Sequence, residues 1–460
     1  MNIPRVIIGG ICSGVGKTTI SIGLMNSLRE AGFTVQAFKV GPDYIDPSYH
    51  KAVTQRPSEN LDAWMLPRDQ IIEIFRYATV DADIALIEGV MGLYDGISGV
   101  DEAGSTAHIA KILRCPVILI IDVYAVARSA GAIALGYQSF DKDVKIAGII
   151  LNRVGNSSHA LWCKNAIENA TRIPVIGALP VNENIVLSER HLGLIPTVEK
   201  KPLNQFFTAA TDFIKKNVDL NAIIRIAKSA PELPIVSRNV FPTEKHEKTV
   251  TIGVAFDEAF NFYYPSSLKI LEAYGAEIKY FSPIHDGGLP PNIDGCYIGG
   301  GFPEMLAKNL EENVAMRQAV RKAAEDEMPI YAECGGLMYL TDEIVDFEGR
   351  SFQMAGLLHA KTVMTKKVLL NYATAEVISD NLLSSTGDKI RGHEFHSSKI
   401  VDIPVDAKFA YLMKKGEGID RQHDGWLQHN VLASYLHIHF AQNADFARCL
   451  IEKCRKYHRQ

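Results

Sequence analysis

The segment Gly9–Thr19, GGICSGVGKTT, carries glycines, a lysine and two threonines in an arrangement that could bind phosphate. Glycines let the backbone approach an anion closely, and the N–H groups at the start of a following helix point toward it. Lys17 would reach the terminal phosphates of ATP, and Thr18 would hold Mg²⁺. Five residues separate Gly10 from the Gly16–Lys17 pair, where the common pattern has four. The alternative is a glycine turn with an exposed lysine, but the flanking strand and helix favour ATP binding.

One more ATP-binding residue is expected at the end of a later strand. Asn152 in LNRV could read the base edge of ATP or could cap a turn, and the sequence leaves both interpretations open. The predicted ATP-binding residues are Gly10, Ser13, Gly14, Gly16, Lys17, Thr18, Thr19 and Asn152.

Acidic residues follow two further predicted strands. Asp43 and Asp46 lie in FKVGPDYIDPSYH, and Glu88 and Asp95 lie in LIEGVMGLYDG. Ligands bind at the carboxyl ends of strands in an open parallel sheet, so these carboxylates would lie near the phosphate loop. Because Mg²⁺ prefers oxygen ligands, we expect Thr18, Asp46 and Glu88 to hold it. Each acid could instead cap a helix or a turn, and this alternative is strongest for Asp95.

The segment YAECGGLMYL indicates a second kind of chemistry, because it places Cys334 between a strand and an apolar helical run. A cysteine on such a turn is exposed at a helix N-terminus, which lowers its pKa and favours a nucleophile. The N–H groups of Gly335 and of Gly301, in the loop YIGGGFPE, would form an oxyanion hole. The late segment ASYLHIHF offers His437 and His439 as bases. This segment predicts a strand, in which both histidines share a face.

Continuous apolar runs indicate the elements that must position these residues. Such runs are typical of parallel strands that are buried on both faces. Strands are expected at PRVII, TVQAFKV, ADIALIEG, PVILIID and IAGIILN, with helices between them. This alternation predicts an α/β fold with a doubly wound parallel sheet.

The strand and helix alternation stops after residue 227 and resumes at Val250–Asp257. The intervening segment is rich in proline and mixed charge, with little periodicity. We therefore predict a P-loop domain at 1–225, a linker at 226–248 and a second α/β domain at 249–460.

The composition excludes several classes of protein. Hydrophobic residues make up 47% and charged residues 22%, a balance typical of globular proteins, and the net charge of −5 argues against binding to nucleic acid or to an anionic membrane. Seven cysteines without a C-x-x-C pair argue against a disulfide framework and a structural zinc site. The longest apolar run, PVILIIDVYAVA, is shorter than the ~20 residues that span a bilayer. We expect a cytoplasmic protein.

Two resemblances build on these motifs. The five-residue spacing in the phosphate loop resembles that of dethiobiotin synthetase and its relatives, which phosphorylate a carboxylate or carbamate. A glycine loop, a Cys-Gly-Gly turn and a late histidine, in that order, resemble a class I glutamine amidotransferase. This implies that Cys334 attacks the side-chain amide of glutamine and releases ammonia, with His437 as the base. The histidine motif of that family ends in a glutamate that orients the base, and His439 stands at its position; which residue orients His437 stays open.

A P-loop synthetase joined to an amidotransferase resembles the cobyrinic acid a,c-diamide synthases of corrinoid biosynthesis. The stretches that carry this resemblance are SGVGKTT, FKVGPDYIDPSYH, RPSENLDAWM, IEGVMGLYDG, GSTAHIAK, IGGGFPE, RGHEFHSS and SYLHIHF. The resemblance implies that ATP activates a carboxylate as an acyl phosphate and that ammonia displaces the phosphate. The cofactors would be ATP and Mg²⁺, and the partners would be a tetrapyrrole carboxylate and L-glutamine. A homodimer is left open.

Two alternatives to the cobyrinic acid reaction also stay open. The same family includes the enzyme that amidates nickel-sirohydrochlorin for a nickel coenzyme of methanogens, and the motifs do not separate the two macrocycles. The chain could also be a nucleotide-regulated binding protein with an inactive amidotransferase half, although such proteins usually lose the cysteine or the histidine.

If the chain is such a synthase, Asp43, Tyr44 and Asp95 would position the substrate. Arg391–Ser398, RGHEFHSS, would line the macrocycle pocket or contact the other domain.

Overall fold

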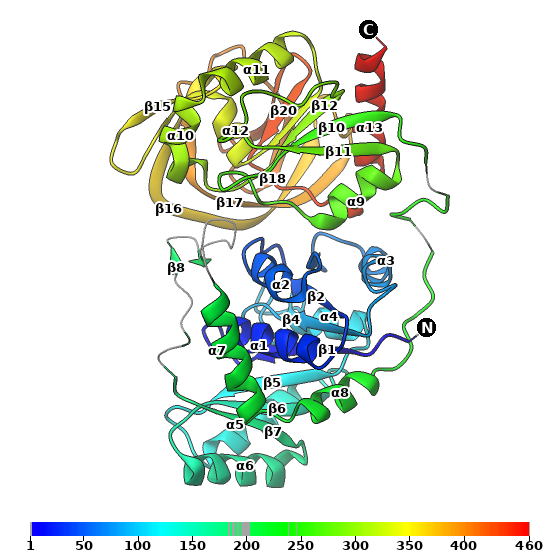
Figure 1. Ribbon diagram of the computed structural model, residues 1–460, viewed down its shortest axis with the longest axis vertical. Helices are drawn as coiled ribbons and strands as arrows, with labels where there is room; N and C mark the ends of the chain where they lie inside the picture. Colours follow the sequence, from blue (N-terminus) through cyan, green and yellow to red (C-terminus); the bar gives the residue numbers. More distant parts are fainter. Residues whose placement is uncertain are drawn as a thin grey trace. The chain divides into compact units, whose positions relative to one another are not determined.

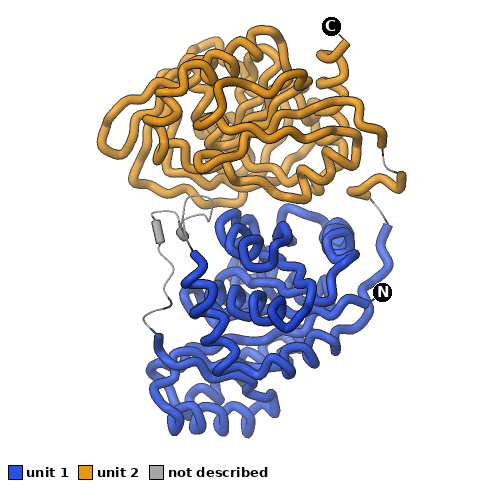
Figure 2. The backbone as a smooth tube through the Cα atoms, viewed as in Figure 1, with its two compact units in different colours: residues 1–237 blue, residues 238–460 orange. Residues whose placement is uncertain are grey.

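The computed structural model describes residues 2–182, 185, 189–190, 193–194, 203–237, 239–244 and 246–459. The chain divides into two compact units, Met1–Ser237 and Arg238–Gln460 (Figure 2). Helix α8 (Leu220–Lys228) belongs to the first unit and extends past residue 225. The domain boundaries given above, with a linker at 226–248, stay a prediction.

The first unit is built on a sheet of seven strands, in the order β3-β2-β4-β1-β5-β6-β7. All neighbouring strands of this sheet run parallel. They are β1 (Arg5–Gly10), β2 (Val35–Val40), β3 (Glu59–Leu61), β4 (Ile84–Glu88), β5 (Val117–Asp122), β6 (Ile146–Val154) and β7 (Val175–Pro180). Every residue of β1, β2 and β4 is buried, which explains their apolar sequences. The predicted doubly wound parallel sheet is confirmed.

The order of the strands reverses at β1, whose neighbours are β4 and β5. Because crossover connections are right-handed, the helices cover both faces of such a sheet. Helix α1 packs beside α7, and α5 packs beside α6 (Figure 1). Besides α8, the helices of this unit are α1 (Lys17–Glu30), α2 (Asp46–Thr54), α3 (Arg68–Ala78), α4 (Thr106–Ile112), α5 (Ser129–Phe140), α6 (Ser157–Thr171) and α7 (Asn204–Asn217). Ligands bind at such a reversal point, and the loop between β1 and α1 lies there.

The second unit is built on a mixed sheet of eleven strands. Its parallel part runs β11-β10-β12-β13-β20, and β19, β18 and β16 continue it with antiparallel pairs. The long strands β16 and β17 form an antiparallel ribbon (Figure 1). The strands are β10 (Val250–Ala255), β11 (Ala276–Phe281), β12 (Gly295–Ile298), β13 (Ile330–Glu333), β14 (Thr341–Val345), β15 (Ser351–Gln353), β16 (Leu358–Val377), β17 (Lys389–Val401), β18 (Lys408–Lys415), β19 (His423–Gln428) and β20 (Val431–Ser434).

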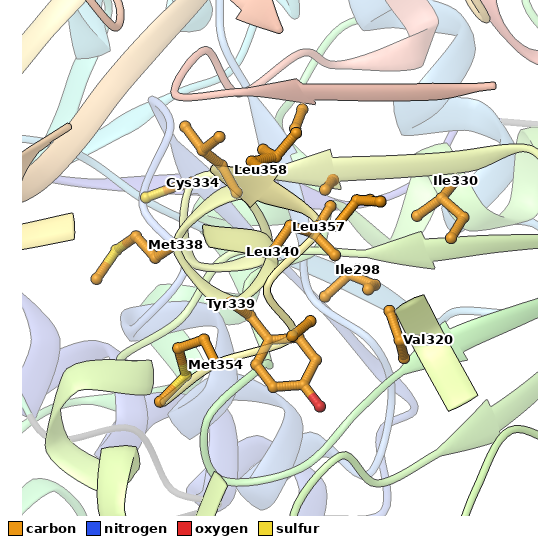
Figure 3. Packing of buried hydrophobic residues seen from close by; sticks show 14 of the residues in the cluster. Ile298, Val320, Ile330, Cys334, Met338, Tyr339, Leu340, Met354, Leu357 and Leu358 are labelled. Atoms are coloured by element: carbon orange, nitrogen blue, oxygen red, sulfur yellow. The ribbon is translucent and has the colours of Figure 1, made fainter. Parts of the chain in front are cut away.

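The core of the second unit gathers around α12 (Gly335–Leu340), whose six residues are all buried. Tyr339 and Leu340 pack in one cluster with Ile298 of β12 and Ile330 of β13 (Figure 3). These apolar contacts fix the helix and the turn that leads into it. The other α-helices of this unit are α9 (Pro265–Ala273), α10 (Ala307–Glu312), α11 (Val314–Glu325) and α13 (Asp445–His458). Over the described ranges, no helix is both long enough and apolar enough to cross a membrane.

Candidate active sites

The phosphate loop connects β1 to α1 with two residues of positive φ, Gly14 at 73° and Gly16 at 94°. Side chains rarely adopt this conformation, so the glycines meet a backbone requirement. A Cβ at Gly10 would lie 2.4 Å from Cγ1 of Val15, which shows how closely the loop folds over the strand end. Ser13 is exposed in the loop, and Thr19 is half-buried in the first turn of α1.

Lys17 is bent back over this loop. Its Nζ donates a hydrogen bond to the carbonyl oxygen of Cys12 at 3.0 Å, and the side chain is buried. Burial, followed by the neighbouring charge of Lys39, lowers the pKa of Lys17. A cation held among loop residues in this way is positioned to neutralise phosphate charge.

The predicted metal ligands come together beside the loop. Oγ1 of Thr18 donates to Oε1 of Glu88 at 2.7 Å and to Oδ2 of Asp46 at 3.3 Å. Glu88 is the last residue of β4 and Asp46 the first of α2, so strand order places them next to the start of α1. A hydroxyl and two carboxylates fit Mg²⁺, which takes its remaining ligands from phosphates and water. In the described part of the chain, no cluster of three or more His, Cys, Asp or Glu could hold a metal.

Lys39 of β2 lies inside this cluster and is not among the residues predicted from the sequence. Its buried Nζ lies 2.5 Å from Oδ2 of Asp46 and 2.8 Å from Oε1 of Glu88. Burial opposes ionisation of Glu88, but the charges and hydrogen bonds of Lys39 and His50 together outweigh it and hold the pKa of this carboxyl well below its usual range. His50 of α2 contacts the other oxygen of Glu88 at 2.7 Å. The available signal was a lysine within the apolar strand TVQAFKV, which must be paired if the strand is buried.

The remaining predicted residues of the first unit surround this cluster. Asp43 accepts hydrogen bonds from the amides of Ile45 and Asp46, at 2.7 and 3.1 Å, and its other oxygen lies 4.0 Å from Nζ of Lys39. Tyr44 is buried. Their roles in binding substrate stay predictions.

Asp95 and Asn152 both support local backbone. Asp95 accepts from the amide of Gly92 at 2.8 Å within its own turn, which is the alternative that the sequence left open. The amide nitrogen of Asn152 donates to the carbonyl oxygen of Val15 at 2.9 Å, and a Cβ at Gly16 would lie 2.7 Å from that nitrogen. Asn152 therefore stabilises the phosphate loop, and its contact with the nucleotide stays a prediction.

Cys334 occupies the turn between β13 and α12 with φ 48° and ψ −98°, a strained conformation for a residue with a side chain. Its amide donates to the carbonyl oxygen of Ser434 at 2.7 Å, and its Sγ donates to that of Phe395 at 3.5 Å. A Cβ at Gly336 would lie 2.1 Å from the carbonyl oxygen of Ile298, so only glycine fits two residues after Cys334. This is the geometry of a nucleophile elbow.

The environment of Cys334 differs from the expected one. Cys334 is 2% exposed rather than open to solvent, and burial, followed by the charge of Glu304, raises the pKa of its thiol. The sequence motif predicted the turn but could not show that strand β17 lies beside it. The expectation that the pKa of Cys334 is lowered was wrong. A neutral thiol needs a base to become a nucleophile.

The glycine loop after β12 lies against both the elbow and His437. The amide nitrogen of Gly301 lies 3.1 Å from the point that a Cβ of Gly335 would occupy. A Cβ at Gly300 would lie 2.6 Å from Cε1 of His437. The structure thus brings Gly301, Gly335 and His437 close together around the turn of Cys334.

The two late histidines have different surroundings. His437 is fully buried, and burial, followed by the charges of His393 and His396, lowers its pKa well below the usual value. His439 accepts a hydrogen bond from the amide of Ala441 on Nδ1, at 3.1 Å, and its Nε2 contacts Oγ of Ser266 at 3.1 Å. His439 thus caps the 3₁₀ helix Phe440–Gln442.

The predicted strand across both histidines was too long. β20 ends at Ser434, and His437 forms an isolated bridge to His393. The chain leaves the sheet here because the amide of Leu436 bonds the Asp424 carboxylate, and that of Ile438 bonds Glu333. Because His437 and His439 lie beyond the end of the strand, the rule that alternate residues of a strand share a face does not apply to them.

Replacing Lys17 with alanine tests the phosphate loop. We expect Lys17→Ala to abolish ATP turnover with either glutamine or ammonia as nitrogen source, because positioning and charge neutralisation supply most of the catalysis of phosphoryl transfer. The measurement is ADP release, with Lys142→Ala, an exposed lysine of the same unit, as the matched control. Product formation at the normal rate from ammonia would contradict the assignment of this loop.

Paired substitutions test which histidine is the base. We expect His437→Asn to lower the glutaminase rate by ~10²-fold or more, the usual scale for a general base. His439→Asn should lower it much less, because both ring nitrogens of His439 are bonded to Ser266 and Ala441. Glutamate release is measured on folded variants, with ammonia-dependent activity as the control. A larger loss in His439→Asn would make His439 the base.

Comparisons with known proteins give the family. Residues 6–194 match the CobQ/CobB/MinD/ParA nucleotide binding domain, and residues 251–445 match the CobB/CobQ-like glutamine amidotransferase domain. A solved structure of PurLQS from Thermotoga maritima aligns with 45% of this chain and 99% of its own at 18% identity, with a TM-score of 0.34.

Three full-length relatives carry the name cobyrinate a,c-diamide synthase. The protein of that name from Dehalococcoides mccartyi is 46% identical, with 100% of each chain covered. Its namesake from Methanosarcina barkeri is 43% identical over 99% of this chain and 97% of its own. The one from Priestia megaterium is 41% identical over 99% and 98%. The chain therefore belongs to the cobyrinate a,c-diamide synthase family.

Proposed function

We propose that this protein is a carbon–nitrogen ligase that amidates the a and c acetate carboxylates of cobyrinic acid, with ATP as activator and glutamine as nitrogen donor. The observation that carries the proposal is the presence of two different sites in one chain. The first combines the phosphate loop with Thr18, Asp46 and Glu88. The second combines Cys334 on its strained turn with the loop of Gly301 and with His437.

In the first unit, a substrate carboxylate attacks the γ-phosphorus of ATP, which gives an acyl phosphate and ADP. Lys17 neutralises phosphate charge, and the N–H groups of the loop orient the phosphates. Thr18, Asp46 and Glu88 would hold Mg²⁺, which supplies further charge neutralisation when bound. Asp43, Tyr44 and Asp95 would position the carboxylate. Ammonia then attacks the acyl carbon, and inorganic phosphate leaves.

In the second unit, the thiol of Cys334 attacks the side-chain carbonyl of glutamine while His437 takes the thiol proton. The N–H groups of Gly301 and Gly335 would stabilise the tetrahedral oxyanion. The proton on His437 goes to the leaving nitrogen, and ammonia departs from a thioester on Cys334. Water then hydrolyses the thioester to glutamate and restores the thiol, which completes the balance of the reaction.

The choice of cobyrinic acid rests on the relatives. Those from bacteria and from Methanosarcina barkeri all carry the cobyrinate name, which does not favour nickel-sirohydrochlorin. The proposal of an enzyme rather than a binding protein rests on the presence of both Cys334 and His437.

All seven cysteines are free, which supports the proposal that the protein works in a reducing cytoplasm.

The replacement Cys334→Ala tests the division of labour between the sites. We expect Cys334→Ala to abolish glutamine-dependent amidation, because the thiol releases ammonia from glutamine. Ammonia-dependent amidation should stay within about twofold of the wild-type rate, because free ammonia reaches the synthetase site without the thiol. Amidation of cobyrinic acid is followed by mass spectrometry, with Cys163→Ala, a cysteine in the first unit, as the control. If a folded Cys334→Ala variant lost both activities, or kept glutaminase activity, the assignment of Cys334 would be wrong.

A further inference from the structure

Strand β17 contains the segment Arg391–Ser398, to which the proposed mechanism gives no role. This strand contacts both reacting groups of the glutaminase site. The carbonyl oxygen of Phe395 accepts from Sγ of Cys334 at 3.5 Å. The amide of His437 donates to the carbonyl oxygen of His393 at 2.9 Å, and the amide of His393 donates back at 3.2 Å. Strand β17 therefore contacts both the thiol of Cys334 and the backbone of His437.

The side chain of His393 extends this link to the imidazole of His437. The two rings are stacked, with centroids 4.7 Å apart and planes 9° from parallel. Nε2 of His393 lies 2.8 Å from Oη of Tyr264, the residue that precedes α9, so the ring of His393 is itself held. Burial lowers the pKa of His393 to about 3, which keeps the ring neutral beside the base.

The residue at the usual place of the orienting acid is engaged elsewhere. His439 has one ring nitrogen on the amide of Ala441 and the other on Oγ of Ser266. His439 is therefore not the group that fixes the plane of the His437 ring. The stack of His393 lies on the face of that ring, and Gly300 approaches it so closely that a Cβ there would lie 2.6 Å from Cε1.

We infer that His393 is a positioning residue that orients His437 by stacking, in place of the glutamate that orients the base in the amidotransferases this unit resembles. The inference rests on the proposed function, since it takes His437 as the base of the glutaminase. A base must come within ~2.6–3.2 Å of the thiol to take its proton. Rotation of the ring about its bond to Cβ displaces both nitrogens, and a misplacement of ~1 Å can cost about 10²-fold in rate. The stack restrains this rotation.

Three variants separate stacking from other effects of the substitution. His393→Ala removes the ring, and we expect kcat for glutamate release to fall about 10- to 100-fold while KM for glutamine changes by less than about twofold. His393→Phe keeps a flat ring at this place, and kcat should recover to within about threefold of the wild type. Tyr264→Phe removes only the hydroxyl that holds His393 and should lower kcat by about threefold or more.

Controls in the same protein separate this inference from the proposed function. Ammonia-dependent amidation by each variant shows that the first unit works, and circular dichroism checks the fold. His437→Asn should lower the rate of glutamate release by ~10²-fold or more; if it does not, the proposed base is wrong, whatever His393 does.

The inference is overturned if His393→Ala keeps wild-type kcat while His437→Asn loses ~10²-fold or more. It is also overturned if His393→Phe is as impaired as His393→Ala, or if only KM rises, because stacking would then not orient the base. If His393→Ala does not fold, Tyr264→Phe decides: a lower kcat at unchanged KM supports the inference, and wild-type kcat rejects it.

Discussion

Each site depends on a turn of positive φ at the carboxyl end of a buried parallel strand. After β1 the turn uses Gly14 and Gly16, so its N–H groups can face an anion. After β13 the turn is made by Cys334 itself, at φ 48°. A non-glycine residue holds this conformation only when its surroundings enforce it. The apolar packing of α12 and the close contact of Gly336 with Ile298 supply that enforcement.

The two sites differ in how they treat charge. In the first unit, Lys39 and His50 hold the pKa of Glu88 well below its usual range, so this buried carboxyl stays ionised, whereas burial and the charge of Asp43 raise the pKa of Asp46 even though Lys39 lies beside it. In the second unit, burial raises the pKa of Cys334 and lowers that of His437, so both groups rest neutral. Attack on glutamine therefore requires a proton to move from sulfur to the imidazole, which makes the orientation of the imidazole important.

Local patterns predicted the parts of the sites that depend on a few neighbouring residues. The glycines around Lys17 and Cys334 were recognisable because each turn restricts the residues beside it. The parallel sheet followed from continuous apolar runs. The partners of Lys39, His50 and His393 could not be found in this way, because they depend on which strands become neighbours. Lys39 meets Glu88 because β2 pairs with β4, and His393 forms its bridge with His437, which lies much later in the sequence.

The late histidines show a second limit of local patterns. An alternating segment predicts a strand, but side-chain carboxylates competed for the backbone amides. Asp424 and Glu333 accept from Leu436 and Ile438, and the strand ends at Ser434. Such competition depends on distant residues, since Glu333 lies on β13 and Asp424 on β19. The exposure of Cys334 was misjudged for a related reason, because the covering strand β17 comes later in the chain.

The central claim is that the first unit makes an acyl phosphate that ammonia from the second unit consumes. Its most direct test uses cobyrinic acid labelled with ¹⁸O in the acetate carboxylates, together with ATP and glutamine. Formation of each amide should transfer one ¹⁸O atom from the carboxylate to inorganic phosphate, measured by mass spectrometry of the phosphate. The Cys334→Ala variant supplied with ammonia should transfer label in the same ratio. Amide formation with unlabelled phosphate would contradict the account, because no bond between the carboxylate oxygen and phosphorus would then have formed.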